Sequence, residues 1–157
     1  LTQLNEEARA NPNDARVPEA IARVLIEAGR LQEAYDAATK PGVKPAASIF
    51  STIAVQIWRK VYVDPKKPQV NLMSTEERTR WVELGLQAID RAAKIDSKDL
   101  STLAYYGLLL REKAKLEPDP EKVLEIQLEA QKWTEKAVAL SKATAPPADA
   151  AASKPAN

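Results

Sequence analysis

Apolar residues recur at intervals of three and four along most of this chain, which is the spacing of one face of an α-helix. The first clear stripe runs through Val17, Ile21, Leu25 and Ala28. Later stripes have the same spacing. Two of them are Phe50, Ile53, Ala54, Ile57 and Val61, and then Trp81, Leu84, Ala88, Ala92 and Ile95. The last two are Leu103, Tyr106, Gly107, Leu110 and Ala114, and then Val123, Ile126, Ala130, Trp133, Ala137 and Leu140. We predict helices over about residues 1–10, 14–28, 31–40, 46–62, 74–95, 99–117 and 120–142.

Residues that start or end helices separate these stripes. Pro12 ends the first helix, because the residue before a proline avoids the α region. Gly29 is placed to end the second helix as a C-cap glycine. The N-cap patterns are Asp14, Ser74 with Glu77, and Asp119 followed by Pro120. Consecutive helices joined in this way predict helical hairpins.

The composition favours an all-α chain of one domain. Of 157 residues, 45% are hydrophobic but only 5% are aromatic, because alanine supplies much of the apolar content. Alanine is the strongest helix former and lets helices approach closely. We assign residues 1–142 to one helical domain. Residues 143–157 are mostly alanine and proline and are predicted to be a disordered tail. A tether or a recognition peptide is the alternative for this tail.

Charge and residue types exclude several functions. Lys plus Arg is 23 and Asp plus Glu is 22, with the signs interspersed, so no basic stripe indicates nucleic-acid binding. The chain has no histidine and no cysteine, which excludes imidazole and thiolate metal sites and nucleophilic cysteine. Adjacent acids such as Glu76 and Glu77 are typical of solvated or capping positions, and no glycine-rich phosphate loop is present. We expect no catalysis, no cofactor and no bound metal.

The sequence also bears on compartment. No apolar run approaches the ~20 residues of a membrane-spanning helix, and no signal peptide is evident. The chain begins at Leu1 rather than at methionine, so we expect that processing or truncation removed an upstream segment. This start, the lack of cysteine and the tail favour an exported bacterial protein, and a cytoplasmic origin fits nearly as well.

The hairpin around Gly29 carries the strongest motif. Ile21 and Ala22 precede Leu25, Gly29 forms the turn, and Glu33 and Ala34 follow on the second helix. This order resembles the tetratricopeptide repeat, whose first helix reads W-x-x-L-G-x-x-Y and whose second helix bears small residues before an exit proline. The chain departs from the family at Pro18, which replaces the tryptophan, and in an insertion of about 19 residues within the second hairpin.

The resemblance implies a superhelical solenoid of about three hairpins, preceded by a half-repeat at residues 1–10. It places small residues where the two helices of each hairpin cross, and a large side chain there would cost about 1–3 kcal/mol. The small residues are Ala22, Ala54 and Gly107 on the first helices, and Ala34, Gly85 and Ala130 on the second helices. Trp81 and Trp133 lie on apolar stripes, and we expect them in the core.

The resemblance further implies that the first helix of each hairpin lines a concave groove for an extended peptide or a partner protein. The groove-facing residues would be Arg16, Glu19, Arg23, Ser51, Val55, Trp58, Arg59, Ala104, Leu108 and Arg111. Trp58 beside Arg59 is typical of an interaction hot spot. Alternatively, Trp58 packs against neighbouring helices and the arginines pair with Glu19, Glu27 and Glu112.

Two functions remain open from the sequence. The first is a non-catalytic scaffold that binds a peptide or protein in the groove. The second is a structural or oligomerisation segment of a larger repeat protein, without a groove ligand and with self-association. The half-repeat at the start favours the second, because Leu1 and Leu4 would have lost a preceding helix.

Overall fold

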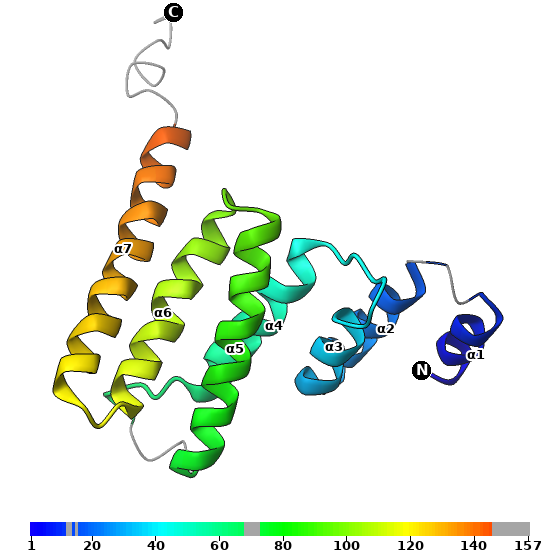
Figure 1. Cartoon of the computed structure of the whole chain (residues 1–157), viewed down its shortest axis with the longest axis horizontal. Helices are drawn as coiled ribbons and strands as arrows, with labels where there is room; N and C mark the ends of the chain where they lie inside the picture. The colour runs from blue at the N-terminus through cyan, green and yellow to red at the C-terminus, as the bar shows by residue number, and fades with distance from the viewer. Residues whose placement is uncertain (12–13, 15, 68–72, 146–157) are drawn as a thin grey trace, which may run out of the picture.

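The computed structural model describes residues 1–11, 14, 16–67 and 73–145, and these residues are all-α. The described helices are α1 (Thr2–Ala10), α2 (Arg16–Glu27), α3 (Leu31–Ala38), α4 (Ala47–Val61), α5 (Thr75–Ile95), α6 (Leu100–Leu116) and α7 (Pro120–Thr144). They follow one another in chain order along the molecule (Figure 1). The predicted helices are therefore confirmed. Helix α7 runs past the predicted end at residue 142, and the rest of the predicted tail, 146–157, lies outside the described residues.

The turn between α2 and α3 is built on Gly29, as predicted. Gly29 has φ +71°, the left-handed conformation that glycine adopts without a Cβ penalty. Its N–H donates to the Ile26 carbonyl at 3.0 Å, and the Arg30 N–H donates to the Leu25 carbonyl at 2.8 Å. This pair of bonds is the Schellman motif, which satisfies carbonyls at the helix end and turns the chain into α3.

Two predicted N-caps, Ser74 and Asp119, are also confirmed, and Asp99, predicted only as the start of a helix, caps α6 as well. The Ser74 hydroxyl accepts from the Glu77 N–H at the start of α5. A carboxylate of Asp99 accepts from the Thr102 N–H of α6 at 2.8 Å. The Asp119 carboxylate accepts from the Glu121 N–H of α7 at 3.0 Å. Each cap satisfies an N–H that has no partner inside the helix and contributes about 1 kcal/mol.

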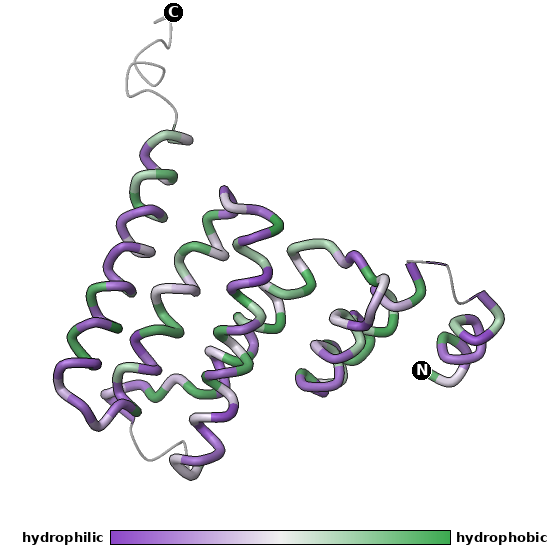
Figure 2. Tube along the Cα trace, in the orientation of Figure 1, coloured by the Kyte–Doolittle hydropathy of each residue, from purple (hydrophilic) through white to green (hydrophobic). Residues whose placement is uncertain are grey.

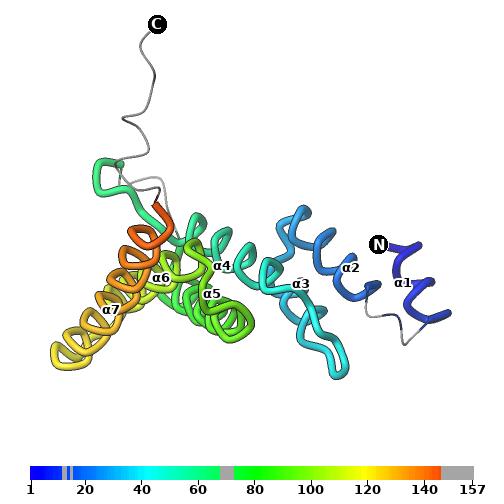
Figure 3. Tube along the Cα trace, turned by 90° about the horizontal axis from the view of Figure 1, so that it is seen from above, coloured from blue at the N-terminus to red at the C-terminus, as the bar shows by residue number. Residues whose placement is uncertain are grey.

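The helices pack in chain order. Each described helix contacts the next, and α2 also contacts α4, as α4 contacts α6. Green apolar segments recur with purple polar ones between them along the helices in Figure 2, as the periodicity predicts. Figure 3 shows the same succession of helices from above.

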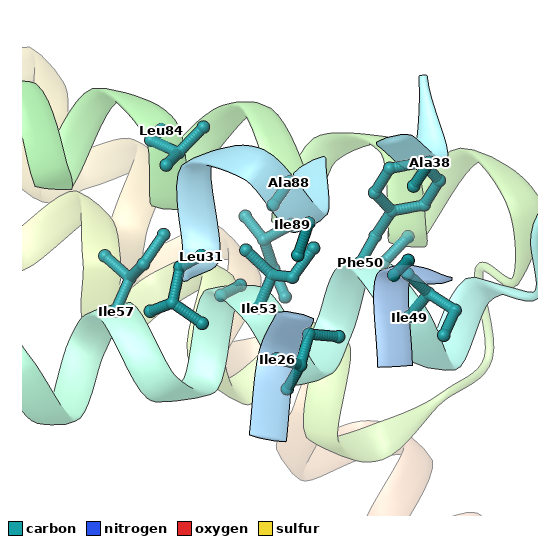
Figure 4. Packing of buried hydrophobic residues seen from close by; sticks show 14 of the residues in the cluster. Ile26, Leu31, Ala38, Ile49, Phe50, Ile53, Ile57, Leu84, Ala88 and Ile89 are labelled. Carbon is teal, nitrogen blue, oxygen red and sulfur yellow. The ribbon is translucent and has the colours of Figure 1, made fainter. Parts of the chain in front are cut away.

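The core is centred on α4. Phe50, Ile53 and Ile57 of α4 are at most 2% exposed. They lie among Ile26 of α2, Leu31 of α3, and Leu84, Ala88 and Ile89 of α5 (Figure 4). Each fully buried side chain of this size contributes about 1.5–3 kcal/mol through the apolar surface removed from water. Helix α1 has no buried residue and packs mainly against α2.

Small residues allow close helix crossings where they were predicted. A Cβ added at Gly107 of α6 would lie 3.0 Å from the Ala130 carbonyl oxygen and 3.0 Å from Thr134 Oγ1, both on α7. A Cβ added at Gly85 of α5 would lie 2.9 Å from Leu109 Cδ2 and 3.0 Å from Ile57 Cγ2. Gly85 therefore faces both α4 and α6.

The apolar surface of α7 is wider than predicted. The predicted stripe is at least half-buried, and Ala130 and Ala137 are fully buried against α6. However, Leu124, Leu128 and Val138 are 57%, 55% and 47% exposed. They lie on a second line along the helix that no other described helix covers. Ile95, predicted to end the stripe of α5, is likewise 53% exposed.

Candidate partner-binding site

None of the residues predicted to line the groove is buried. Arg16, Arg23, Arg59 and Arg111 are exposed. Ser51, Val55, Trp58 and Leu108 are half-buried, as are Glu19 and Ala104. They belong to α2, α4 and α6, and α4 contacts both of the other two helices as well as its neighbours in the chain. We call the surface formed by these predicted residues the first-helix face.

Trp58 lies at the junction between α4 and α6. Its ring stacks on Tyr62 at 4.7 Å and meets Tyr105 of α6 edge-to-face at 5.5 Å. The indole Nε1 is buried without a hydrogen-bond partner among the described residues. Because a buried unsatisfied donor costs about 1–3 kcal/mol, an acceptor brought to this position would relieve it. The side chain thus packs against neighbouring helices, as the alternative interpretation holds, while part of it stays exposed.

Two of the predicted arginines are engaged by nearby carboxylates. Arg23 pairs with Glu19 at 2.7 Å, one helical turn apart, and Arg16 pairs with Asp14 at 2.8 Å. The hydrogen bond from Arg23 lowers the pKa of Glu19, and hydrogen bonds from the Arg16 side chain and backbone lower the pKa of Asp14 to about 2. These exposed pairs are worth little energetically. They do mean that α2 offers less free positive charge than its sequence suggests.

Arg59 and Arg111 differ from the arginines of α2. Within the part of the chain that the structure describes, neither has a carboxylate within 4.0 Å. Arg111 donates to Thr134 Oγ1 at 3.2 Å, and the nearby Glu112 pairs instead with Lys115 at 2.7 Å. The expected internal pairing of Arg111 is therefore not seen, and both guanidinium groups can meet a carboxylate from outside.

The predicted residues of α6 line a hollow that α6 shares with α7. It has a volume of about 380 Å³. Its lining consists of Leu100, Ala104, Leu108 and Arg111 of α6, with Thr134, Ala137, Val138 and Ser141 of α7. The hollow is mostly apolar, and Arg111 is the one charged side chain among the described residues that line it. The structure thus places Leu108 and Arg111 here, and Trp58 at the junction with Tyr105.

Sequence reasoning missed the other half of the Trp58 environment. Glu112 of α6 is buried, and the ammonium group of its partner Lys115 lies 5.7 Å from the centre of the Tyr62 ring. The signal was available: Tyr105, Leu109, Glu112 and Leu116 form a second stripe at helical spacing on α6. A helix packed on two sides needs two stripes, and only the one facing α7 was identified.

Comparison with models of known protein families, with curated proteins and with solved structures finds no match to this chain. The tetratricopeptide resemblance therefore depends on the residues and on the succession of helices. No helix in the described ranges has the length and apolarity needed to cross a membrane. The same residues contain no cluster of acidic side chains suited to a metal ion.

Proposed function

We propose that this protein is a non-catalytic interaction scaffold, built as a tetratricopeptide-like solenoid, that binds a partner segment on its first-helix face. One observation carries the proposal: α4 contacts α2 on one side and α6 on the other. In a solenoid of helical hairpins, contact between successive first helices makes one continuous surface across the repeats. Here that surface bears a partly exposed tryptophan and two arginines without carboxylate partners among the described residues.

The surface fits an extended peptide with an apolar side chain and nearby carboxylates. The apolar hollow between α6 and α7 accepts the side chain next to Leu108. Arg111 at that hollow and Arg59 on α4 meet the carboxylates, since guanidinium groups bind carboxylates through paired hydrogen bonds. Trp58 supplies a rigid aromatic contact, the residue type that most often dominates binding energy at interfaces.

A phage-displayed library of random peptides tests this proposal. Peptides that are enriched on the immobilised protein are synthesised, and their affinity is measured by fluorescence polarisation. We expect enriched peptides to combine Asp or Glu with a large apolar residue. The double variant R59E/R111E should weaken their binding about 100-fold or more, because each lost charge-assisted contact is worth about 1.5–3 kcal/mol.

Two matched controls make the result specific. The variant R80E/K122E changes the same charge at two exposed positions on α5 and α7, outside the first-helix face, and should leave peptide affinity unchanged. Circular dichroism and thermal melting of R59E/R111E should match wild type. Failure to enrich any sequence, or equal loss of affinity in both double variants, would count against the first-helix face.

One observation favours a second function, a structural or self-associating segment. Leu124, Leu128 and Val138 of α7 form an exposed apolar line, and Val138 also borders the hollow together with Leu100. In a solenoid, the next helix would cover this end face. Sedimentation equilibrium of wild type and of L124K/L128K separates the two functions. Self-association that the double variant abolishes supports a covered end face, and a monomer at all concentrations argues for the scaffold alone.

A further inference from the structure

A second concave site lies where α3, the α3–α4 connection and α5 meet. Its volume is about 450 Å³. The residues lining it are Ala38, Thr39, Val43, Lys44, Pro45, Phe50, Arg91, Lys94 and Ile95. None of them belongs to the first-helix face, so ligand binding at this site can be tested independently of the proposed scaffold function. We call it the Arg91 pocket.

Arg91 is held in position over an aromatic floor. Its guanidinium carbon lies 5.8 Å from the centre of the Tyr35 ring and 5.8 Å from that of Phe50. Arg91 Nε donates to the Tyr35 hydroxyl at 3.0 Å. The two rings contact each other edge-to-face at 5.9 Å, which fixes the floor. An arginine ordered in this way loses less conformational entropy when it binds a ligand than a free surface arginine does.

The charge of the Arg91 pocket is unbalanced. Lys44, Arg91 and Lys94 contribute three positive charges, and the described residues that line the pocket include no acidic side chain. Asp90 pairs with Lys94 at 2.6 Å and offsets one of them. The hydrogen bond from Lys94 also keeps the pKa of Asp90 low, so this carboxylate stays charged and stays with the lysine. Arg91 itself has no carboxylate within 4.0 Å among the described residues.

The remaining surface of the pocket is mostly apolar, with Thr39 as a polar residue in the lining. Phe50 forms part of the floor, and Val43, Pro45 and Ala38 form the sides. Ile95 at the C-terminal end of α5 is 53% exposed and lines the pocket. A ligand in the pocket would cover this side chain and gain about 25 cal/mol for each Å² of apolar surface that it removes from water.

We propose that the Arg91 pocket binds a carboxylate carried on a short apolar chain. Arg91 binds the carboxylate through its Nη groups, Lys44 and Lys94 add long-range attraction, and Val43, Pro45 and Ile95 contact the chain. Two sources supply this chemistry: a free aliphatic carboxylic acid, or the C-terminal residue of a peptide that ends in leucine. A phosphate or sulfate ion shares the charge but lacks the apolar part that the pocket would cover.

Titrations monitored by two-dimensional ¹⁵N–¹H NMR spectra test the proposal on the full chain. The probes are hexanoate against hexan-1-ol, and acetyl-Ala-Leu with a free carboxylate against its C-terminal amide. We expect saturable shifts of the Phe50, Arg91 and Ile95 amides with at least one of the two acids. The matched alcohol or amide should bind about tenfold or more weakly, because it lacks the charge-assisted hydrogen bonds. Whichever acid binds more tightly identifies the source.

Variants then assign the contact. Arg91→Gln should weaken binding of the acid about tenfold or more, and Lys94→Gln should weaken it less. Arg80→Gln, on the same helix but outside the pocket, should leave binding unchanged. If Arg91→Gln melts at a lower temperature than wild type, the double variant Lys44→Gln/Lys94→Gln is tested in its place. Added salt should then weaken the acid binding that this double variant retains. Equal binding of acid and alcohol, unchanged affinity in Arg91→Gln, or no saturable shift at millimolar ligand overturns the proposal.

Discussion

The ring of Tyr106 on α6 lies flat on the ring of Trp133 on α7, with centroids 4.0 Å apart and planes 7° apart. The Tyr106 hydroxyl donates to Asp90 Oδ1 on α5 at 3.0 Å. One side chain therefore joins three consecutive helices. Its neighbour Gly107 lets α7 approach α6 closely enough for the rings to meet. We expect this junction to decide whether the last hairpin is ordered.

Truncation of Trp133 should loosen that hairpin. Trp133→Ala should lower the free energy of unfolding by about 2–3 kcal/mol, somewhat less than for a fully buried tryptophan, because Trp133 is only half-buried. Trp133→Phe should cost about half as much, since it retains a stacked ring. Urea denaturation followed by circular dichroism measures both, with exposed Lys132→Ala as the control. Equal losses for Trp133→Ala and Lys132→Ala would show that the stack contributes nothing.

The Tyr106–Asp90 bond should make stability fall at alkaline pH. Burial, and then the hydrogen bond to Asp90, raise the pKa of Tyr106 above its ordinary value of about 10. Below about pH 10 the tyrosine is protonated in both states, and its contribution is fully present. Above that pH the unfolded chain releases the proton while the folded chain keeps it, so unfolding becomes easier.

The comparison with Tyr106→Phe isolates this effect. Urea unfolding at several values between pH ~8 and ~11 should show wild type losing its advantage over Tyr106→Phe as the pH rises. Tyr35→Phe serves as a control for a tyrosine outside this junction. A constant difference between wild type and Tyr106→Phe across this range would contradict the raised pKa.

The close crossing at Gly107 predicts a large cost for a bulky residue. Gly107→Leu would place its side chain against the Ala130 carbonyl, which is backbone and cannot turn aside, so we expect a loss of about 1–3 kcal/mol or more. Lys113→Leu, at an exposed site on the same helix, should change stability by less than about 0.5 kcal/mol. Thermal melting compares the two. A melting temperature of Gly107→Leu near that of Lys113→Leu would mean that α7 can move away from α6 without a loss of stability.

Local signals explain why the helices could be predicted from the sequence. The caps at Ser74, Asp99 and Asp119 and the turn at Gly29 depend on residues within one helical turn of each other. The crossing at Gly107 also had a local sign, since a glycine inside a helix is unfavourable unless a neighbour needs the space. These features follow from the chain wherever the helix finally lies.

The candidate sites depend on tertiary contacts, which is why the sequence predicted them only in part. Leu124 and Leu128 are apolar residues on α7, but the sequence does not show whether another helix covers them. The Arg91 pocket joins Phe50 with Arg91, and nothing near either residue indicates the other. The sequence indicated Glu112 only as a possible partner of an arginine, because its burial depends on α6 having neighbours on both sides.

Glu112 provides the last prediction, because it is a buried carboxylate whose partner is exposed. Its side chain is 4% exposed and that of Lys115 is 57% exposed, with 2.7 Å between Lys115 Nζ and Glu112 Oε1. Lys115→Met removes the partner and leaves a buried acceptor uncompensated, which should cost about 1–3 kcal/mol. Glu112→Gln should cost less, because a neutral amide is easier to keep buried than an unpaired charge.

A double-mutant cycle measured by urea denaturation tests this asymmetry. Adding Glu112→Gln to Lys115→Met should recover part of the lost stability, since the charge that needed the lysine is gone. Lys113→Met, two positions away on the same helix and exposed, should be close to neutral. If Lys115→Met changes stability as little as Lys113→Met does, the buried Glu112 carboxylate does not depend on Lys115 to offset its charge. The junction of Trp58, Tyr62 and Tyr105 would then be held without this ion pair.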